Sequence, residues 1–144
     1  QNIFKTGGMQ IPVSFVYTYT KAEITGNNNA SGFVSGDLLK AVPENVFSLR
    51  AGFEHSSGWD NYAIIKYIDE TCVSTGCNRS NDAFGKTESL FVVDWVSRYE
   101  YSSNTDLFLK VTNLFDNQVI ISREPDGARP NKPRTISAGV RIDF

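Results

Sequence analysis

The last eight residues of the chain, SAGVRIDF, alternate between apolar and polar side chains and end on an aromatic residue. Successive side chains of an extended strand point to opposite faces. One face would carry Ala138, Val140, Ile142 and Phe144, and the other Ser137, Gly139, Arg141 and Asp143. An apolar face opposite a charged one suits a membrane barrel, with lipid outside and a wet lumen inside. A half-buried strand of a soluble protein is the alternative.

Composition and charge exclude several other classes of protein. Of the 144 residues, 40% are hydrophobic and 12% aromatic, and no run approaches the roughly 20 apolar residues of a membrane helix. The formal net charge is -2 and no run of Lys or Arg is present, so the sequence offers no groove for nucleic acid. The first residues, QNIFKTGG, do not form a signal peptide, so an exported protein would have lost it or be represented only in part.

Alternation bounded by turn residues predicts an all-β, antiparallel chain with six strands and no helix. The predicted strands span about residues 10–24, 44–55, 59–69, 87–101, 105–115 and 134–144. Short connections at 56–59 and 102–105 alternate with long ones at 25–43, 70–86 and 116–133. Short turns at one end and long loops at the other are typical of outer-membrane barrels, whose short turns face the periplasm. Aromatic girdles at the membrane interfaces would comprise Tyr17, Tyr19, Trp59, Trp95, Tyr99 and Tyr101.

Six strands are too few for a membrane barrel. A closed barrel needs about eight strands, and an open edge in lipid would leave N–H and C=O groups without partners. We therefore expect an antiparallel transmembrane β-barrel segment that does not close alone and pairs with further strands from the same protein or a second chain. The alternative is a soluble antiparallel β-sandwich that binds a carbohydrate or a protein.

Several segments resemble the C-terminal end of TonB-dependent outer-membrane receptors, most closely the ferric dicitrate type. They are GDLLKAVPENVFSLRAGFEH (36–55), YIDE (67–70), VTNLFDNQVIISREPDGARPNKPRT (111–135) and the terminal strand. The terminal strand also resembles the signal that the barrel-assembly machinery reads, with Gly139, Ile142 and Phe144 as the matching residues.

This resemblance implies that residues 1–144 are the last strands of a barrel of about 22 strands around a plug. It implies import of a ferric chelate, siderophore or similar nutrient across a bacterial outer membrane, energised through TonB, and no enzyme activity. The plug domain and the TonB box would be absent from this chain. The implied partners are the remaining barrel strands and plug, the TonB complex, the assembly machinery and outer-membrane lipid, with no nucleic acid and no covalently bound cofactor.

Two sets of charged residues are candidate site residues. The last long connection carries Arg123, Arg129, Lys132 and Arg134, which would capture an anionic ferric chelate or anchor the loop through Asp116, Glu124 or Asp126. We favour loop anchoring. The predicted strands would direct toward the lumen Arg50, Glu54, Lys66, Asp94, Arg98, Glu100, Lys110, Arg141 and Asp143. A solvated network facing a plug is a simpler role for these residues than substrate contact.

The remaining chemistry is limited to two cysteines and one histidine. Cys72 and Cys77 lie in one long connection with four residues between them, which predicts a local disulfide in an oxidising compartment. His55 is the sole histidine, so a zinc site lacks ligands and a Ser-His-Asp arrangement lacks an oriented base. The sequence therefore predicts no catalytic site and no metal site.

Overall fold

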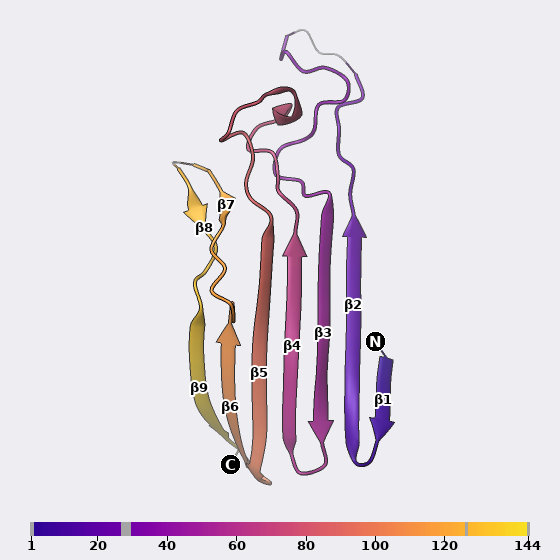
Figure 1. The fold of residues 1–144 in the computed structure, drawn as a ribbon, viewed down its shortest axis with the longest axis vertical. Coiled ribbons are helices and arrows are strands. Elements are labelled where there is room, and N and C mark those ends of the chain that lie inside the picture. Colours follow the sequence, from indigo (N-terminus) through magenta and orange to yellow (C-terminus); the bar gives the residue numbers. More distant parts are fainter. Residues whose placement is uncertain (1, 27–29, 126, 144) are drawn as a thin grey trace.

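The computed structural model describes residues 2–26, 30–125 and 127–143, and its main element is one antiparallel sheet (Figure 1). Seven strands follow in the order β1-β2-β3-β4-β5-β6-β9. They span Asn2–Thr6 (β1), Met9–Tyr19 (β2), Asn45–His55 (β3), Trp59–Ile68 (β4), Leu90–Ser102 (β5), Thr105–Thr112 (β6) and Thr135–Ile142 (β9). A two-stranded hairpin of β7 (Ile120–Ser122) and β8 (Arg129–Pro130) and a 3-10 helix, η1 (Cys77–Arg79), lie in the connections.

The all-β prediction is confirmed, although β1 was not predicted. Its sequence NIFKT also alternates, and the turn that joins it to β2 is Gly7-Gly8, with φ of 51° and 79°. A Gly-Gly pair between alternating segments is a known hairpin signal, because glycine adopts positive φ without steric cost. No helix in the described part of the chain is long and apolar enough to cross a membrane.

Some predicted strands were too long at the loop end. The first ends at Tyr19, because Glu23 instead forms an isolated bridge with Leu38 within the following connection. The fifth ends at Thr112, because Asn113 turns the chain with a φ of 52°. The fourth begins at Leu90. Beyond these points the chain leaves the strand pairing of the sheet.

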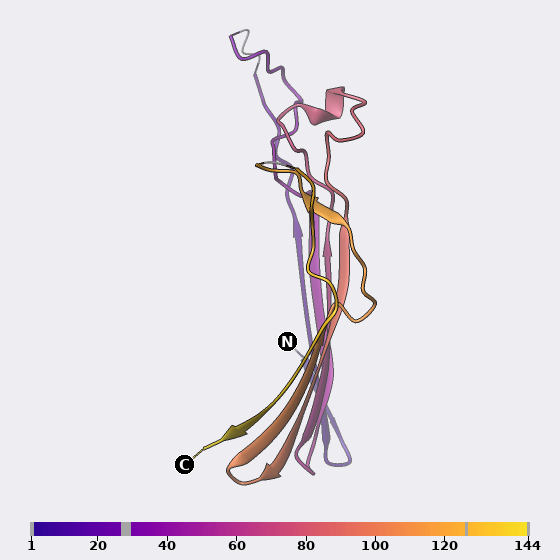
Figure 2. The same cartoon turned by 90° about the vertical axis from the view of Figure 1, so that its left-hand side faces the viewer.

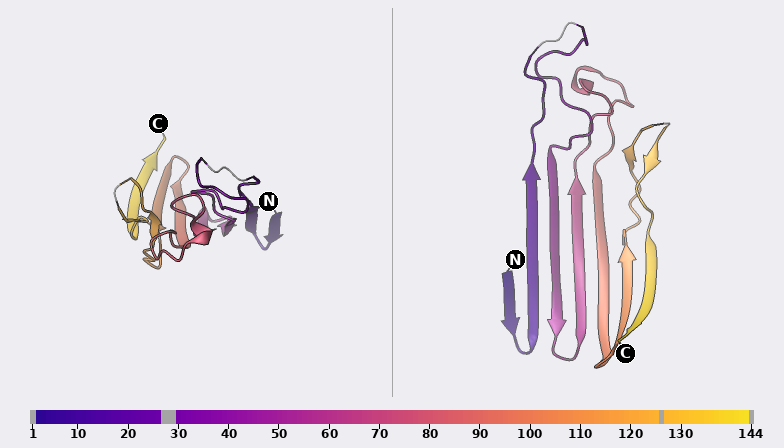
Figure 3. Two further views of the ribbon diagram at one scale, coloured as in Figure 1. Left: turned by 90° about the horizontal axis from the view of Figure 1, so that it is seen from above. Right: turned by 180° about the vertical axis from the view of Figure 1, so that it is seen from behind.

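The sheet is a single curved layer, as the edge-on view shows (Figure 2). Among the described residues no second sheet packs against either face, so the two-layer sandwich is not formed. β1 and β9 are the two edges and do not pair with each other. The tight turns and the end of β9 lie at one end of the sheet, which we call the turn end, and the long connections lie at the other, the loop end (Figure 3).

Strand register sorts the side chains into two faces. Phe15 lies opposite Leu49, Leu49 opposite Ile65, and Ile65 opposite Val93. This series defines the apolar face, made of the odd-numbered residues of β2 to β6 and the even-numbered residues of β9. The opposite face, which we call the charged face, carries most of the ionised strand residues, with interspersed apolar ones. Each strand therefore presents one apolar and one wet surface.

The apolar face is exposed rather than packed. Phe15 is 62% exposed and Val140 58%, and the buried hydrophobic core of the described residues is limited to Cys72, Cys77, Val93 and Val111. Burial of apolar surface is the main favourable contribution to folding in water, and a soluble protein rarely leaves such a continuous apolar surface uncovered. An outer surface covered by lipid accounts for this face.

Aromatic side chains mark both ends of the apolar face. At the loop end the rings of Phe47 and Tyr67 stack with centroids 5.2 Å apart. At the turn end Phe53 and Trp59 meet edge to face at 6.3 Å. Trp95 was predicted to lie near a strand end, but it sits in the middle of β5, opposite Ala63. It therefore belongs to the middle of the apolar face rather than to a girdle.

Candidate functional site at the loop end and on the charged face

The three long connections contact one another beyond the loop end of the sheet, and we call them the loop unit. They are residues 20–44, 69–89 and 113–134. Lys40 forms a parallel bridge with Cys72, and Cys72 forms an antiparallel bridge with Lys86. Backbone pairing thus continues beyond the strand ends. The first two connections form one structure rather than two separate loops.

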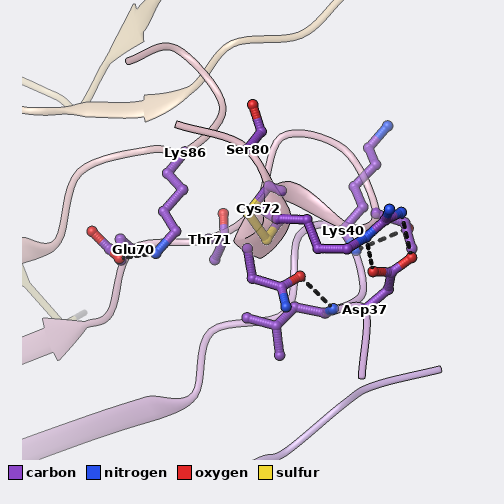
Figure 4. Close-up of a disulfide and its surroundings, with 12 residues drawn as sticks. Asp37, Lys40, Glu70, Thr71, Cys72, Ser80 and Lys86 are labelled. Carbon is purple, nitrogen blue, oxygen red and sulfur yellow. Dashed lines mark hydrogen bonds and ion pairs between the residues drawn. A yellow bond between two sulfur atoms is a disulfide. The ribbon is translucent and has the colours of Figure 1, made fainter. Parts of the chain in front are cut away.

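The disulfide predicted from the sequence, Cys72–Cys77, is present, with Cα atoms 5.5 Å apart and both residues buried (Figure 4). It closes a short loop that leads directly into η1. The last residue of η1, Arg79, points its guanidinium at Asp37 of the preceding connection. The disulfide therefore lies next to the contact that joins the two connections.

Asp37 is fully buried and is held by charge-assisted hydrogen bonds. Arg79 donates from Nη2 to Oδ2 at 2.9 Å and from Nε to Oδ1, and the Val34 amide donates to Oδ2 at 3.0 Å. The Arg79 hydrogen bonds and then the Val34 amide hold the pKa of Asp37 below its ordinary value. A carboxylate with these donors stays ionised although it is shielded from water.

Asn78 adds a second clamp beside this ion pair. Its Oδ1 accepts from the Leu38 amide at 3.0 Å, and its Nδ2 donates to the Gly36 carbonyl at 3.0 Å. Sequence reasoning did not identify Asp37, Asn78 or Arg79. The available signal was the polar pair directly after Cys77, whose partners lie about forty residues earlier in the chain.

The third connection is tied to the other two. Lys40 Nζ lies 2.6 Å from Glu124 Oε1, and Glu88 accepts from the Ile120 amide at 2.6 Å. Arg123 donates to the Lys86 carbonyl at 3.0 Å and lies over the ring of Phe84. All three connections are thus linked by polar contacts.

Two buried asparagines organise the junction between β6 and the third connection. Asn113 donates through Nδ2 to the carbonyls of Asn117 and Lys132, at 2.9 and 3.0 Å. Asn131 accepts from the Val119 amide at 2.8 Å. Residues 113–116 and residues 127–135 therefore meet in space, and the asparagine side chains supply contacts that hold them together.

The four cationic candidates of the third connection separate into two groups. Arg123 and Arg134 donate to backbone carbonyls, of Lys86 and Leu114. Arg129 and Lys132 are exposed, and their side chains make no hydrogen bond or ion pair with the described residues. Among the described residues, none of these four cations forms an ion pair with Asp116 or Glu124, because Glu124 pairs with Lys40 and Asp116 accepts from the Arg134 backbone amide at 2.8 Å. Asp126 lies outside the described residues.

The charged residues predicted to line a lumen that lie within strands share the charged face. They are Arg50, Glu54, Lys66, Asp94, Arg98, Glu100, Lys110 and Arg141. Asp143 follows β9 and pairs with Arg141 at 3.2 Å. Of the predicted assembly signal, Gly139 and Ile142 lie in β9 on opposite faces, and Phe144 lies outside the described residues.

Local pairs neutralise much of this face. Lys66 lies 3.3 Å from Asp94, and Arg98 lies 3.0 Å from Asp106 and 3.3 Å from Asp60. Asp60 and Asp106 were absent from the predicted set, although their even positions in alternating strands could have placed them in it. Arg50 instead stacks over Tyr62, with Cζ 4.0 Å from the ring centroid.

A cavity of about 240 Å³ lies where the loop unit meets the strands. Its lining includes Lys21, Glu44, Glu70 and Lys86, and Lys86 Nζ is 2.5 Å from Glu70 Oε1. Asp69 also borders it, and hydrogen bonds from Tyr67 and Asn45 lower its pKa. Residues of both charges line this cavity. Among the described residues no cluster of His, Cys, Asp and Glu could hold a metal ion.

Sequence comparison finds receptors as relatives. The chain is 27% identical over 140 residues to the metal-pseudopaline receptor of Pseudomonas aeruginosa, covering 94% of the chain and 19% of that receptor. It is 28% identical over 130 residues to the catecholate siderophore receptor of Escherichia coli, covering 89% and 17%. No family model matches. The chain thus spans less than a fifth of the length of these curated relatives.

Solved structures agree with the sequence comparison. The ferric-catecholate import receptor of Escherichia coli K12 in its closed form matches with a TM-score of 0.71 at 27% identity, over 96% of this chain and 19% of that one. The siderophore receptor of Acinetobacter baumannii matches over 95% and 20%, also at 0.71, and at 22% identity this likeness concerns the fold. These relatives and neighbours are receptors for siderophores or for a metal–pseudopaline complex. This chain resembles a fragment of them.

These findings confirm three predictions. The fold class is that of a barrel segment that does not close alone. The homologues are outer-membrane receptors of Gram-negative bacteria, in agreement with the predicted location. They are transport receptors and not enzymes. The ferric dicitrate type stays a prediction, since these relatives are named for other chelates.

Proposed function

We propose that this chain is the C-terminal wall segment of an outer-membrane transporter that imports a ferric chelate or similar nutrient, energised through TonB. The observation that carries the proposal is the match of 96% of the chain to a ferric-catecholate import receptor, at a TM-score of 0.71 and 27% identity. Segregation of the strand residues into an exposed apolar face and a charged face supports it independently.

In this proposal the apolar face contacts lipid and the charged face borders a lumen that contains a plug. The plug and the other strands come from the same gene product or from a second chain, and the other strands pair with the open edges at β1 and β9. The turn end faces the periplasm. The barrel-assembly machinery reads the segment that contains Gly139, Ile142 and Phe144.

The loop unit is then extracellular and meets the chelate first. Arg129 and Lys132 are its best candidates for contact with an anionic chelate, because they are exposed and make no side-chain bond with the described residues. Arg123 and Arg134 have a different role, since their guanidinium groups bind backbone carbonyls and anchor the connection. The relatives are named for pseudopaline and catecholate complexes, and ferric dicitrate is a further chelate of the same class that the uptake experiment tests.

Uptake of radiolabelled iron tests the proposal in cells that make the complete receptor as their sole importer of the tested chelate. Ferric catecholate and ferric dicitrate are supplied separately, with and without an uncoupler of the proton gradient. We expect uptake of one of them that the uncoupler abolishes. The variant Arg129→Ala/Lys132→Ala should reduce uptake at low chelate concentration, whereas Lys5→Ala, which removes an exposed cation of β1 near the turn end, should not. Uptake that is unchanged by the uncoupler, or no uptake of either chelate, would contradict the proposal.

A further inference from the structure

The apolar face is hollowed on both sides of Phe53, near the turn end. One hollow, of about 450 Å³, is lined by Met9, Phe53, His55, Ser57 and Trp59. The other, of about 320 Å³, is lined by Ala51, Gly52, Phe53, Asn61, Tyr62, Ala63 and Trp95. Because both are bordered by Phe53, they adjoin and form one groove along β3 and β4, from the turn end toward the middle of the sheet.

The inner part of this groove exists because two small side chains lie opposite each other. Ala51 pairs with Ala63, and Trp95 lies on the other side of Ala63. Methyl groups between the larger Phe53 and Trp95 side chains leave space for a hydrocarbon chain. Elsewhere on the apolar face the corresponding positions carry larger residues such as Leu49 and Ile65.

Asn61 is a polar residue at the floor of the groove. It is 7% exposed, and its Nδ2 is buried with no hydrogen-bond partner among the described residues. Its neighbours across the sheet are Phe53 and Ser97. An amide without a partner is costly in hydrocarbon. Since the χ2 torsion of asparagine is broad, a rotation of the amide group can turn its donor into the groove.

The turn end of the groove carries a second polar group. His55 Nδ1 accepts from the Ser57 amide at 3.1 Å, so in the neutral ring Nε2 carries the proton and remains a donor. Trp59 Nε1 donates to Ser97 Oγ at 2.9 Å, an arrangement typical of the membrane interface. Along the groove, His55 Nε2 is thus a donor at the turn end, and Asn61 Nδ2 is a second donor at the next residue pair of the apolar face. The apolar slot between Ala51 and Ala63 lies beyond them.

We propose that one phospholipid of the periplasmic leaflet occupies this groove. Its phosphate accepts from His55, an ester carbonyl accepts from Asn61, and an acyl chain lies over Ala51 and Ala63. This order of phosphate, ester and chain matches the order of groups along the groove. The inference rests on the membrane setting of the proposed function, but it concerns the outer wall of the barrel and not the path of the chelate.

Native mass spectrometry of the complete receptor tests this site. The receptor is released from nanodiscs made of phosphatidylethanolamine and phosphatidylglycerol, and retained lipid is counted. We expect one phospholipid to remain bound, and its retained fraction to fall about tenfold in Asn61→Leu, as the loss of one hydrogen bond in hydrocarbon predicts. Ala63→Phe, which fills the slot, should also release it. The control Ala138→Phe enlarges an exposed residue of β9 on the same face and should retain it.

Equal retention in the parent, Asn61→Leu and Ala63→Phe would overturn the proposal, as would equal loss in Ala138→Phe or capture of a polypeptide in place of lipid. Heat-modifiable mobility on a gel reports whether each barrel is folded, and if Ala63→Phe does not fold, Asn61→Leu decides. Chelate uptake separates the two proposals. A receptor that retains the lipid but imports no chelate refutes the proposed function and leaves this site standing, whereas import without specific retention refutes the site alone.

Discussion

Asp37 is a buried carboxylate whose ionisation is maintained by Arg79 and by the Val34 amide. Because the pKa of Asp37 is lowered, its carboxylate binds a proton less readily in the folded loop unit than in the unfolded chain. The contribution of Asp37 to stability is therefore complete above the ordinary carboxyl pKa of about 3.9, and it is lost as the pH falls through the lower folded value.

Asp37→Asn should remove this pH dependence. Hydrogen exchange of the Ile24 and Leu38 amides, both bonded within the loop unit, should be slow in the parent at pH 6 and accelerate below about pH 4, after correction for intrinsic rates. In Asp37→Asn exchange should already be fast at pH 6. Asp82→Asn, an exposed carboxylate of the same loop unit, is the control and should resemble the parent. A parent whose protection does not change with pH would contradict this role of Asp37.

Gly52 and Gly139 on the charged face differ in how much space they leave for a side chain. A Cβ at Gly52 would lie 2.3 Å from the Asn61 carbonyl oxygen, which is backbone. A Cβ at Gly139 would lie 2.3 Å from Phe108 Cζ, the end of a side chain that can swing away. We expect Gly52→Ala to destabilise the barrel by roughly 1–3 kcal/mol and Gly139→Ala by clearly less. Thermal unfolding in detergent measures both, and an equal or reversed order would contradict this interpretation of the geometry.

At the scale of elements, the strands were predictable and the loop contacts were not. Alternation located β2 to β6 and β9, because period-two patterning follows from strand geometry alone. The Asp37–Arg79 and Lys40–Glu124 contacts join residues 42 and 84 positions apart, and no local pattern predicts such pairs. For β1 the Gly7-Gly8 turn is the local sequence signal.

The disulfide should stabilise the loop unit and not the sheet. In the chain-entropy description, closing a loop this short contributes about 2 kcal/mol. Cys72→Ser/Cys77→Ser should therefore speed proteolytic cleavage in the second connection, residues 69–89, while the melting temperature of the barrel changes little. Ser74→Ala, within the same loop, is a control that leaves the bridge intact. A large loss of barrel stability in the double variant would show that the loop unit and the sheet unfold together.

Asn113 should be the most sensitive residue of the third connection. It combines a φ of 52° with part-buried hydrogen bonds to the Asn117 and Lys132 carbonyls, so Asn113→Ala removes one donor from each carbonyl. We expect a loss of roughly 1–3 kcal/mol, measured as faster hydrogen exchange across residues 113–134. The exposed Asn81→Ala is the control. Unchanged exchange in Asn113→Ala would contradict this role of the Asn113 side chain.

At the scale of the whole molecule, the described sheet has open edges and uncovered faces, so it needs further strands at its edges and other material against its faces. Its edges at β1 and β9 lack strand partners in the described chain, its apolar face lacks a core, and its charged face carries paired ions beside open space. The sequence alone predicted this incompleteness, because six strands cannot close a barrel. The identity of the chelate could not be predicted, since its binding residues would lie on loops whose positions depend on long-range contacts.

The assignment of the two faces is tested most directly by spin labels placed on adjacent residues of the complete receptor in a lipid bilayer. Labels at Leu49 and Ala138 report on the apolar face, and labels at Ser48 and Ser137 on the charged face. We predict that the first pair is relaxed mainly by dissolved oxygen, which concentrates in lipid, and the second mainly by a water-soluble nickel chelate. Labels at Leu49 and Ala138 that are shielded from both reagents would indicate a packed protein core and contradict the membrane wall.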